Sequence, residues 1–161
     1  MRAIVNSSPL IFLAKLGKLD ILKELFDEII IPEAVYNEAV VEGSSHEESS
    51  IIKNTEWIKL EKVRNYQLVR FLMEFIDYGE SEAIVLAIEK NADIVILDDK
   101  DARKIARGFG LKVTGTIGVL MLAKRRGLIK EVKPLIEELI REGFRISNDL
   151  LKAILKEINE V

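Results

Sequence analysis

Acidic and amide side chains at the ends of apolar segments are the residues that could carry chemistry in this sequence. Asn6 follows a short strand-like run, and Asp98 and Asp99 follow another. The carboxyl ends of parallel strands meet at one edge of an open sheet, where sites form. We therefore expect the side chains after the first and fourth predicted strands to converge there, together with Thr116, which follows a third strand-like run.

Two acids on predicted helices could complete this group. Glu80 shares a helical face with Ala83 and Ala87, and these small side chains allow the helix to approach the sheet closely. Glu38 lies on the face that also carries Ala34 and Val35. Both carboxylates could then lie over the ends of the strands.

A divalent cation would explain such a group of acids. Carboxylates that lie close together repel and raise each other's pKa, and Mg²⁺ or Mn²⁺ removes this penalty because hard cations prefer oxygen ligands. A bound metal can activate water and clamp a phosphodiester. The chain has no cysteine, which excludes disulfides, thiolate zinc sites and cysteine nucleophiles, and its one histidine, His46, lies in a polar stretch that predicts a solvated loop.

Each acid also has a structural interpretation. Glu80 follows Gly79 at a predicted helix start, where a negative charge interacts favourably with the helix dipole. Asp98 or Asp99 could cap the helix predicted over residues 99–107. Glu38 could be a solvated surface residue.

The elements that would position these residues alternate between strand and helix. Such alternation predicts an α/β fold with a central parallel sheet flanked by helices. We expect Ser7 or Ser8 to cap the first helix and Ser147 to cap the last. Strands are predicted over residues 3–5, 28–31, 57–63 (an edge strand), 93–97 and 111–113, and the helices between and after them over residues 10–16, 19–26, 32–41, 65–76, 80–89, 99–107, 116–126, 132–141 and 148–158.

Length and composition limit the class of protein. The 161 residues suit a single domain over residues 1–161, and 48% hydrophobic with 32% charged residues argue against disorder. No apolar run reaches the roughly 18–20 residues that span a bilayer, and the N-terminal run is too short for a signal peptide, so we expect a cytoplasmic protein. The net charge of −3 disfavours a large RNA-binding footprint but not a local one.

Four segments in order resemble the PIN-domain family over nearly the whole chain. The stretch 4–11 resembles its first strand and turn, 31–38 its second segment, which ends in a helical acid, and 79–87 its third. The stretch 96–103 resembles the fourth, with one acid after a strand and another three residues later. The stretches 110–120 and 143–147 resemble an uncharacterised prokaryotic subgroup of that family.

This resemblance implies a PIN-like three-layer fold and a Mg²⁺- or Mn²⁺-dependent ribonuclease, often the toxin of a toxin–antitoxin pair and often a homodimer. Glu38, Glu80 and Asp98 match three of the four acidic positions that hold the metal and carry catalysis. The fourth position is Asn6, and Asp101 is ancillary.

Other positions are supporting residues or rivals. Ser8 matches a small hydroxyl residue near the metal, and Thr116 is a further supporting residue. Glu82 is the rival to Glu80, and Asp99 the rival to Asp98. Glu80 is preferred because its separation from Asp98 and the position of Ala87 fit the family pattern better.

Asn6 separates two functional hypotheses. Its amide oxygen can bind a metal but brings no charge, so metal affinity should fall. The first hypothesis is a metal-dependent endoribonuclease acting on single-stranded RNA. The alternative is a catalytically weak or inactive PIN-like module that binds RNA or a protein partner. A receiver or phosphatase-like domain is disfavoured because no aspartate follows the first strand.

Two groups of basic residues could contact RNA phosphates, although basic residues in a last helical turn also favour the helix dipole. Apolar residues at helical spacing between positions 68 and 75 are interpreted as core, while protruding helices could bind a second copy or an antitoxin. The basic groups are Lys100, Lys104 and Arg107, and Lys124, Arg125 and Arg126; the apolar residues are Leu68, Phe71, Leu72 and Phe75.

Overall fold

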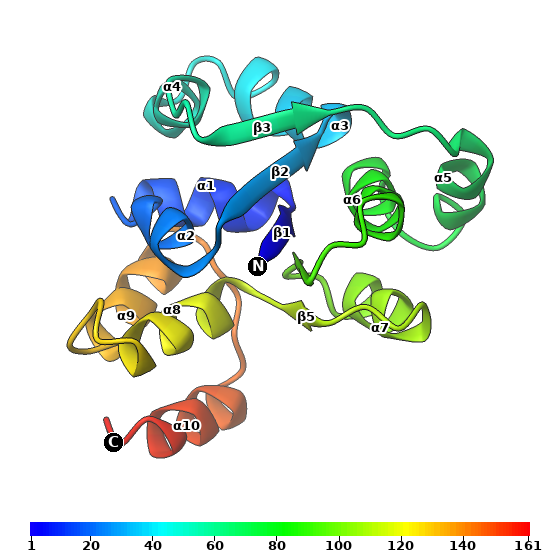
Figure 1. Cartoon of the computed structure of the whole chain (residues 1–161). Coiled ribbons are helices and arrows are strands. Elements are labelled where there is room, and N and C mark those ends of the chain that lie inside the picture. The colour runs from blue at the N-terminus through cyan, green and yellow to red at the C-terminus, as the bar shows by residue number, and fades with distance from the viewer.

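A five-stranded parallel sheet organises the chain in the computed structural model, which describes residues 1–161. The strand order is β3-β2-β1-β4-β5, and Figure 1 shows β3, β2, β1 and β5 from top to bottom with helices on both sides. The predicted α/β fold with its central parallel sheet is confirmed. The strands are β1 (Arg2–Val5), β2 (Glu28–Pro32), β3 (Ile58–Glu61), β4 (Ile94–Ile96) and β5 (Val113–Thr114).

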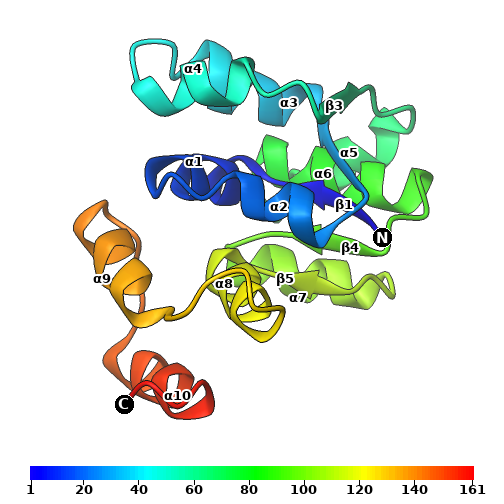
Figure 2. The same ribbon diagram turned by 60° about the vertical axis from the view of Figure 1, so that its left-hand side comes forward.

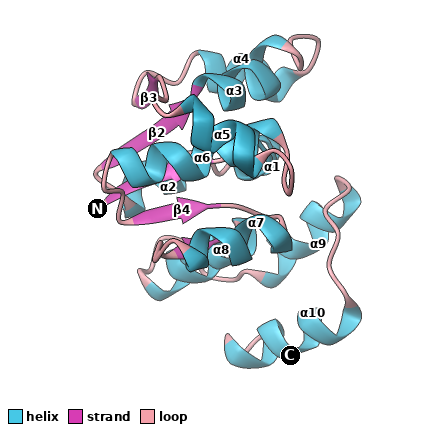
Figure 3. Ribbon diagram, turned by 90° about the vertical axis from the view of Figure 1, so that its right-hand side faces the viewer, coloured by secondary structure: helices cyan, strands magenta, loops and turns pink.

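The helices form a layer on each face of the sheet. One layer holds α1 (Ser7–Lys15), α2 (Asp20–Leu25) and α8 (Thr116–Arg125), and the other holds α5 (Tyr66–Leu72), α6 (Tyr78–Glu89) and α7 (Lys100–Gly108), which face the viewer in Figure 3. Three short elements join β2 to β3: α3 (Glu33–Tyr36), the π-helical turn η1 (Asn37–Val41) and α4 (Glu47–Lys53). The chain ends with α9 (Lys133–Arg141) and α10 (Asn148–Glu157), which lie beyond α8 in Figure 2.

The strands are apolar on both faces because each face is covered by helices. Ala3 and Val5 of β1 point into the core under α1, α2 and α8, whereas Ile4 points into the core under α5, α6 and α7. All three are fully buried. Truncating Ile4 to alanine would cost about 2–5 kcal/mol at such a site.

The order of the strands reverses between β1 and β4. The chain leaves β1 towards β2 and leaves β4 towards β5, on opposite sides of the β1–β4 pair. The backbone N–H of Asn6 donates to the carbonyl of Ile96 at 3.0 Å, which joins the two strand ends. Ligands bind at such a reversal in open parallel sheets, because the connections diverge there and leave a crevice.

Three local predictions can be checked against the elements. Ser147 caps α10, since the N–H of Leu150 donates to its Oγ at 3.2 Å. The prediction that Ser7 or Ser8 caps the first helix is wrong: Asn6 is the N-cap residue, and both serines lie in the first turn. The helix predicted over residues 65–76 ends at Leu72.

The interpretation of the apolar residues 68–75 as core holds only in part. Leu72 is buried and Leu68 packs against the core. Phe71, on the outer side of α5, is 59% exposed, and Phe75, in the turn after α5, is 61% exposed. No helix of the structure is long and apolar enough to cross a bilayer.

Candidate active site at the carboxyl end of the sheet

Asn6 stands where β1 passes into α1, at the strand reversal. Its side chain is 5% exposed, and its Oδ1 is a buried oxygen without a hydrogen-bond partner. Buried polar atoms nearly always have a hydrogen-bond partner, so a buried oxygen without one calls for an explanation, such as a role in cation binding. The amide oxygen of Asn6 is therefore free to bind a cation.

Asp98, two residues after the end of β4, is held by two hydroxyls and a backbone amide. Its Oδ2 accepts from Ser8 Oγ and from Thr116 Oγ1, each at 2.7 Å, and its Oδ1 accepts from the N–H of Thr116 at 2.7 Å. A Cβ at Gly115 would lie 2.8 Å from Oδ1, so only glycine allows this approach. Ser8 and Thr116, both predicted as supporting residues, thus orient the carboxylate.

Glu80 lies in the first turn of α6 and forms a reciprocal capping arrangement with Asp77. Its N–H donates to Asp77 Oδ1 at 2.8 Å, and its own Oε1 accepts from the N–H of Asp77 at 3.1 Å. Burial, together with the negative charges of Asp77 and Asp99, raises the pKa of Glu80 to about 7, although the hydrogen bond from the Asp77 N–H opposes this shift. The side chain therefore exchanges its proton near neutral pH.

These three side chains line one hollow of about 280 Å³. No set of three or more acidic, histidine or cysteine side chains is arranged to hold a metal. Asn6, Glu80 and Asp98 offer two carboxylates and one amide, all of which suit a hard cation, and the two carboxylate charges would balance a divalent ion. The lining consists of Asn6, Ser8, Phe12, Glu80, Asp98, Asp99, Gly143, Phe144 and Arg145.

Glu38 lies beside this hollow and does not line it. It projects from the π-helical turn η1, and its Oε2 accepts from Ser7 Oγ at 3.0 Å. A methyl group at Gly79 would overlap Glu38 Oε1, so the start of α6 and this carboxylate touch. Burial raises the pKa of Glu38, the hydrogen bond from Ser7 opposes the shift, and the charges of Asp77 and Glu42 add to it. Its role as a metal ligand stays a prediction.

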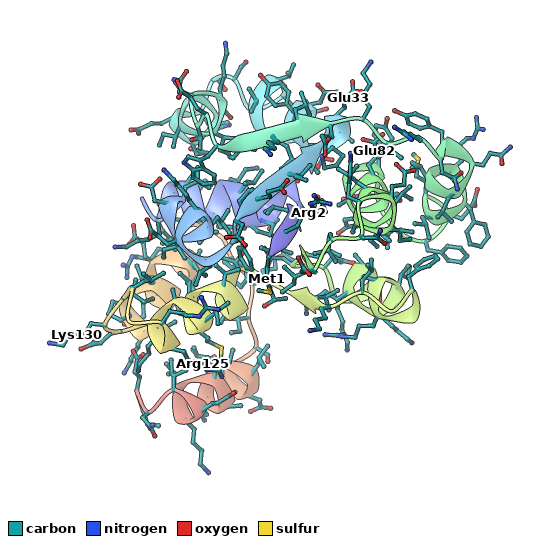
Figure 4. All side chains as sticks on the ribbon, viewed as in Figure 1. Met1, Arg2, Glu33, Glu82, Arg125 and Lys130 are labelled. Carbon is teal, nitrogen blue, oxygen red and sulfur yellow. The ribbon has the colours of Figure 1, made fainter.

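The rival acids have other roles. Glu82 is fully buried, and its Oε1 accepts from the N–H of Ala34 at 2.9 Å, which ties α6 to the start of α3; Figure 4 shows Glu82 near Glu33 there. Asp99 caps α7 through the N–H of Ala102 at 2.8 Å and also lines the hollow. Asp101 is exposed and does not line the hollow.

The predicted RNA-contacting basic residues do not line the hollow either. Lys100, Lys104 and Arg107 are exposed on α7. Lys124 Nζ donates to the carbonyl of Ile158 at 2.6 Å and to Glu160 at 2.8 Å, and Arg125, labelled in Figure 4, pairs with Glu157 at 3.2 Å. The second basic group thus fastens α8 to the C-terminal segment.

Sequence reasoning missed Asp77, Phe144, Arg145 and Arg103. Asp77 could have been found, because Asp77 and Glu80 form a capping-box pattern. Phe144 and Arg145 reach the hollow only because the segment between α9 and α10 passes beside Asp98 and Phe12. Arg103 donates from Nη1 to the carbonyls of Leu97 and Asp98 at 3.2 and 2.6 Å.

Comparison with known proteins agrees with this architecture. A solved structure of a PilT N-terminus domain protein from the hyperthermophilic archaeon Sulfolobus solfataricus P2 is similar in fold. It has 22% sequence identity and a TM-score of 0.52, and the match covers 74% of this chain and 91% of that chain. No curated protein matches the chain. A family model described as a PIN domain matches residues 2–160, and PIN domains are nuclease-type domains that generally use divalent metal ions. The chain therefore belongs to the PIN-domain family.

Proposed function

We propose that this chain is a Mg²⁺- or Mn²⁺-dependent endoribonuclease that cuts single-stranded RNA. The observation that carries the proposal is the unpartnered buried Oδ1 of Asn6 in the same hollow as Glu80 and Asp98. These three residues would hold the ion. Such an ion lowers the pKa of bound water and stabilises charge on the phosphodiester.

The protein's own contribution is to keep the oxygen atoms in place. Ser8 and Thr116 fix Asp98 from two different helices, α1 and α8, so its carboxylate needs little rearrangement when a ligand arrives. Glu80, with its pKa near 7, can lose its proton as a cation approaches or hold one at the carboxylate when none is present. Phe12 and Phe144 give the hollow an apolar lining beside these oxygen atoms.

The second candidate is a PIN-like module that binds RNA or a protein partner with little or no turnover. Asn6 favours it, because an amide in place of a carboxylate leaves the oxygen set one negative charge short. A smaller charge lowers cation affinity and the stabilisation of the reacting phosphate.

A toxin role with a cognate antitoxin, a homodimeric state and a cytoplasmic location extend the first proposal. The exposed pair Phe71 and Phe75, whose rings lie 5.4 Å apart, is the surface that would serve a protein partner.

A cleavage assay distinguishes the two functions. Purified native protein is incubated with single-stranded RNA and Mn²⁺, with or without EDTA. The Glu80→Gln/Asp98→Asn double variant is incubated with the same RNA and Mn²⁺. Glu56→Gln, an exposed acid outside the hollow, is the matched control. We expect cleavage by the native protein and by the control alone. Cleavage that survives EDTA would refute the metal mechanism, and cleavage that appears only after Asn6→Asp would favour the second candidate.

A further inference from the structure

A second hollow of about 220 Å³ lies directly beside the first. Asp98, Phe144 and Arg145 line both, so these residues form the boundary between them. The second hollow extends over the start of α8 towards α10. Its apolar lining consists of Ile117, Met121, Phe144, Ile146, Leu150 and Ile154.

Two arginines add positive charge to this apolar surface. Arg103 is held beside Asp98 by its bonds to the carbonyls of Leu97 and Asp98. Arg145 is exposed and takes part in none of the ion pairs of the structure. An unpaired guanidinium at the edge of an apolar hollow suits a ligand that combines a flat apolar part with an anionic part.

The aromatic wall between the hollows is held in place. The rings of Phe12 and Phe144 meet edge to face, with centroids 5.1 Å apart and an interplanar angle of 82°. The N–H of Phe144 also donates to the carbonyl of Leu139 at 2.9 Å, which fixes this segment to the end of α9. Whatever enters the second hollow therefore meets a preformed surface.

We propose that the second hollow is a nucleotide subsite, which takes the base adjacent to the phosphate bound at Asn6, Glu80 and Asp98. The subsite rests on the proposed function and deepens it. An unpaired nucleotide has both features that the hollow suits: a flat base for the apolar and aromatic walls, and phosphates for Arg103 and Arg145. A base within a duplex is stacked on both sides and could not enter, so the subsite selects single strands.

Binding of two RNAs by three proteins tests the subsite. The RNAs are a fluorescent uridine hexanucleotide and the same sugar–phosphate chain without bases. The proteins are the native chain and two tryptophan variants. Leu150→Trp fills the hollow from a position that is 52% exposed. Leu128→Trp is the control, at a leucine that is 41% exposed and lies outside both hollows. Affinity is measured by anisotropy with Ca²⁺, and a gel verifies that the RNA stays intact.

We expect base removal to weaken binding more in the native chain and in Leu128→Trp than in Leu150→Trp. The loss of affinity in the first two proteins should exceed the loss in Leu150→Trp by a factor of about 5 to 150. This range corresponds to about 1–3 kcal/mol for one stacked base. An equal effect of base removal in all three proteins would overturn the subsite. The hollow would then be assigned to binding a protein segment instead. The proposed nuclease would survive that result if the RNA still binds and is cleaved with Mn²⁺. Failure of every protein to bind either RNA would instead refute the proposed function, and the subsite with it.

Discussion

Ser8 and Asp98, 90 positions apart in the chain, are joined by a hydrogen bond of 2.7 Å from the serine hydroxyl to Oδ2. The bond connects the first turn of α1 with the end of β4, across the reversal of strand order. Thr116 donates to the same oxygen from α8. One carboxylate oxygen at the end of β4 thus connects α1 with α8.

Replacement of Ser8 by alanine should therefore loosen Asp98. A hydrogen bond to a charged group contributes about 1.5–3 kcal/mol, and Thr116 retains part of the orientation, so we expect a loss near the lower end of this range in urea unfolding. RNA cleavage should fall further than stability does. Ser8→Thr keeps the hydroxyl and serves as the control; equal activity of the alanine and threonine variants would contradict an orienting role.

The raised pKa of Glu80 predicts how the stability of metal-free protein changes with pH. The ordinary pKa of this group is 4.5 and its value in the folded chain is about 7, so the folded state binds more protons between these two pH values. Stability from this group is thus present below pH 4.5 and decreases as the pH rises to about 7. Urea unfolding in EDTA from pH 4.5 to 8 measures the slope.

Glu80→Gln should flatten that slope, because glutamine does not titrate. With saturating Mg²⁺ the native protein should gain stability at pH 7 to 8, since the ion competes with the proton for the same oxygen atoms. A native slope that Glu80→Gln leaves unchanged would show that another group causes it.

The contact between Gly79 and Glu38 predicts a selective effect of adding one methyl group. Gly79→Ala would push against Glu38 Oε1, and the π-helical turn that carries Glu38 would have to shift. Overpacking of this kind costs about 1–3 kcal/mol. Gly108→Ala meets nothing within 4 Å and is the control, with an expected change between zero and a gain of about 1 kcal/mol. Thermal unfolding of both variants is the measurement, and equal melting temperatures would argue against the close approach.

The parts of this site that could be predicted from sequence are those that follow local rules. Asn6 and Asp98 end two buried strands, and strands of a parallel sheet end together, so their convergence could be expected. The choice between Glu80 and Glu82 depends on which side of α6 faces the strand ends, and the resemblance to the family, through the separation from Asp98 and the position of Ala87, favoured Glu80. Glu80 indeed reaches the hollow, while Glu82 binds the start of α3.

Phe144 and Arg145 could not be placed in this way. Their position depends on how α9 and α10 pack on α8, through contacts such as Lys124 with Glu160, and no local pattern encodes such a contact between distant residues. The role of Ser7 was missed for a similar reason. A serine before a helix predicts a cap, but its hydroxyl instead meets Glu38, 31 positions away.

Replacement of Asn6 by aspartate should strengthen metal binding. A full negative charge near a divalent ion is worth several kcal/mol at the effective dielectric of a protein surface, so we expect the Kd for Mn²⁺ to fall by about tenfold or more. In EDTA the same variant should be less stable than the native chain, because a third carboxylate joins Glu80 and Asp98 without a cation. Calorimetric titration with Mn²⁺ measures the affinity, and urea unfolding in EDTA measures the stability. Tighter Mn²⁺ binding without a loss of stability in EDTA would place residue 6 outside the acidic group.

Glu160 predicts a pH dependence of the opposite sign. Its carboxylate accepts from Lys124 Nζ at 2.8 Å and from the N–H groups of Val132 and Lys133 at 2.8 and 2.7 Å. Although burial would raise the pKa of Glu160, these hydrogen bonds hold it below the usual value. Its contribution to stability is thus present above the ordinary pKa of 4.5 and is lost as the pH falls through the lower folded value.

Glu160→Gln should cost about 1–3 kcal/mol at pH 7, because two backbone donors and Lys124 lose their charged partner. Glu157→Gln breaks an ion pair whose side chains are 59% and 62% exposed, so that control should change stability by less than about 1 kcal/mol. Because Glu160 fastens the end of the chain to α8 and the start of α9, its loss should also free α10, which carries Leu150 and Ile154 of the second hollow. RNA affinity should then fall in Glu160→Gln and stay unchanged in Glu157→Gln. Equal affinities would mean that α10 keeps its place without this anchor.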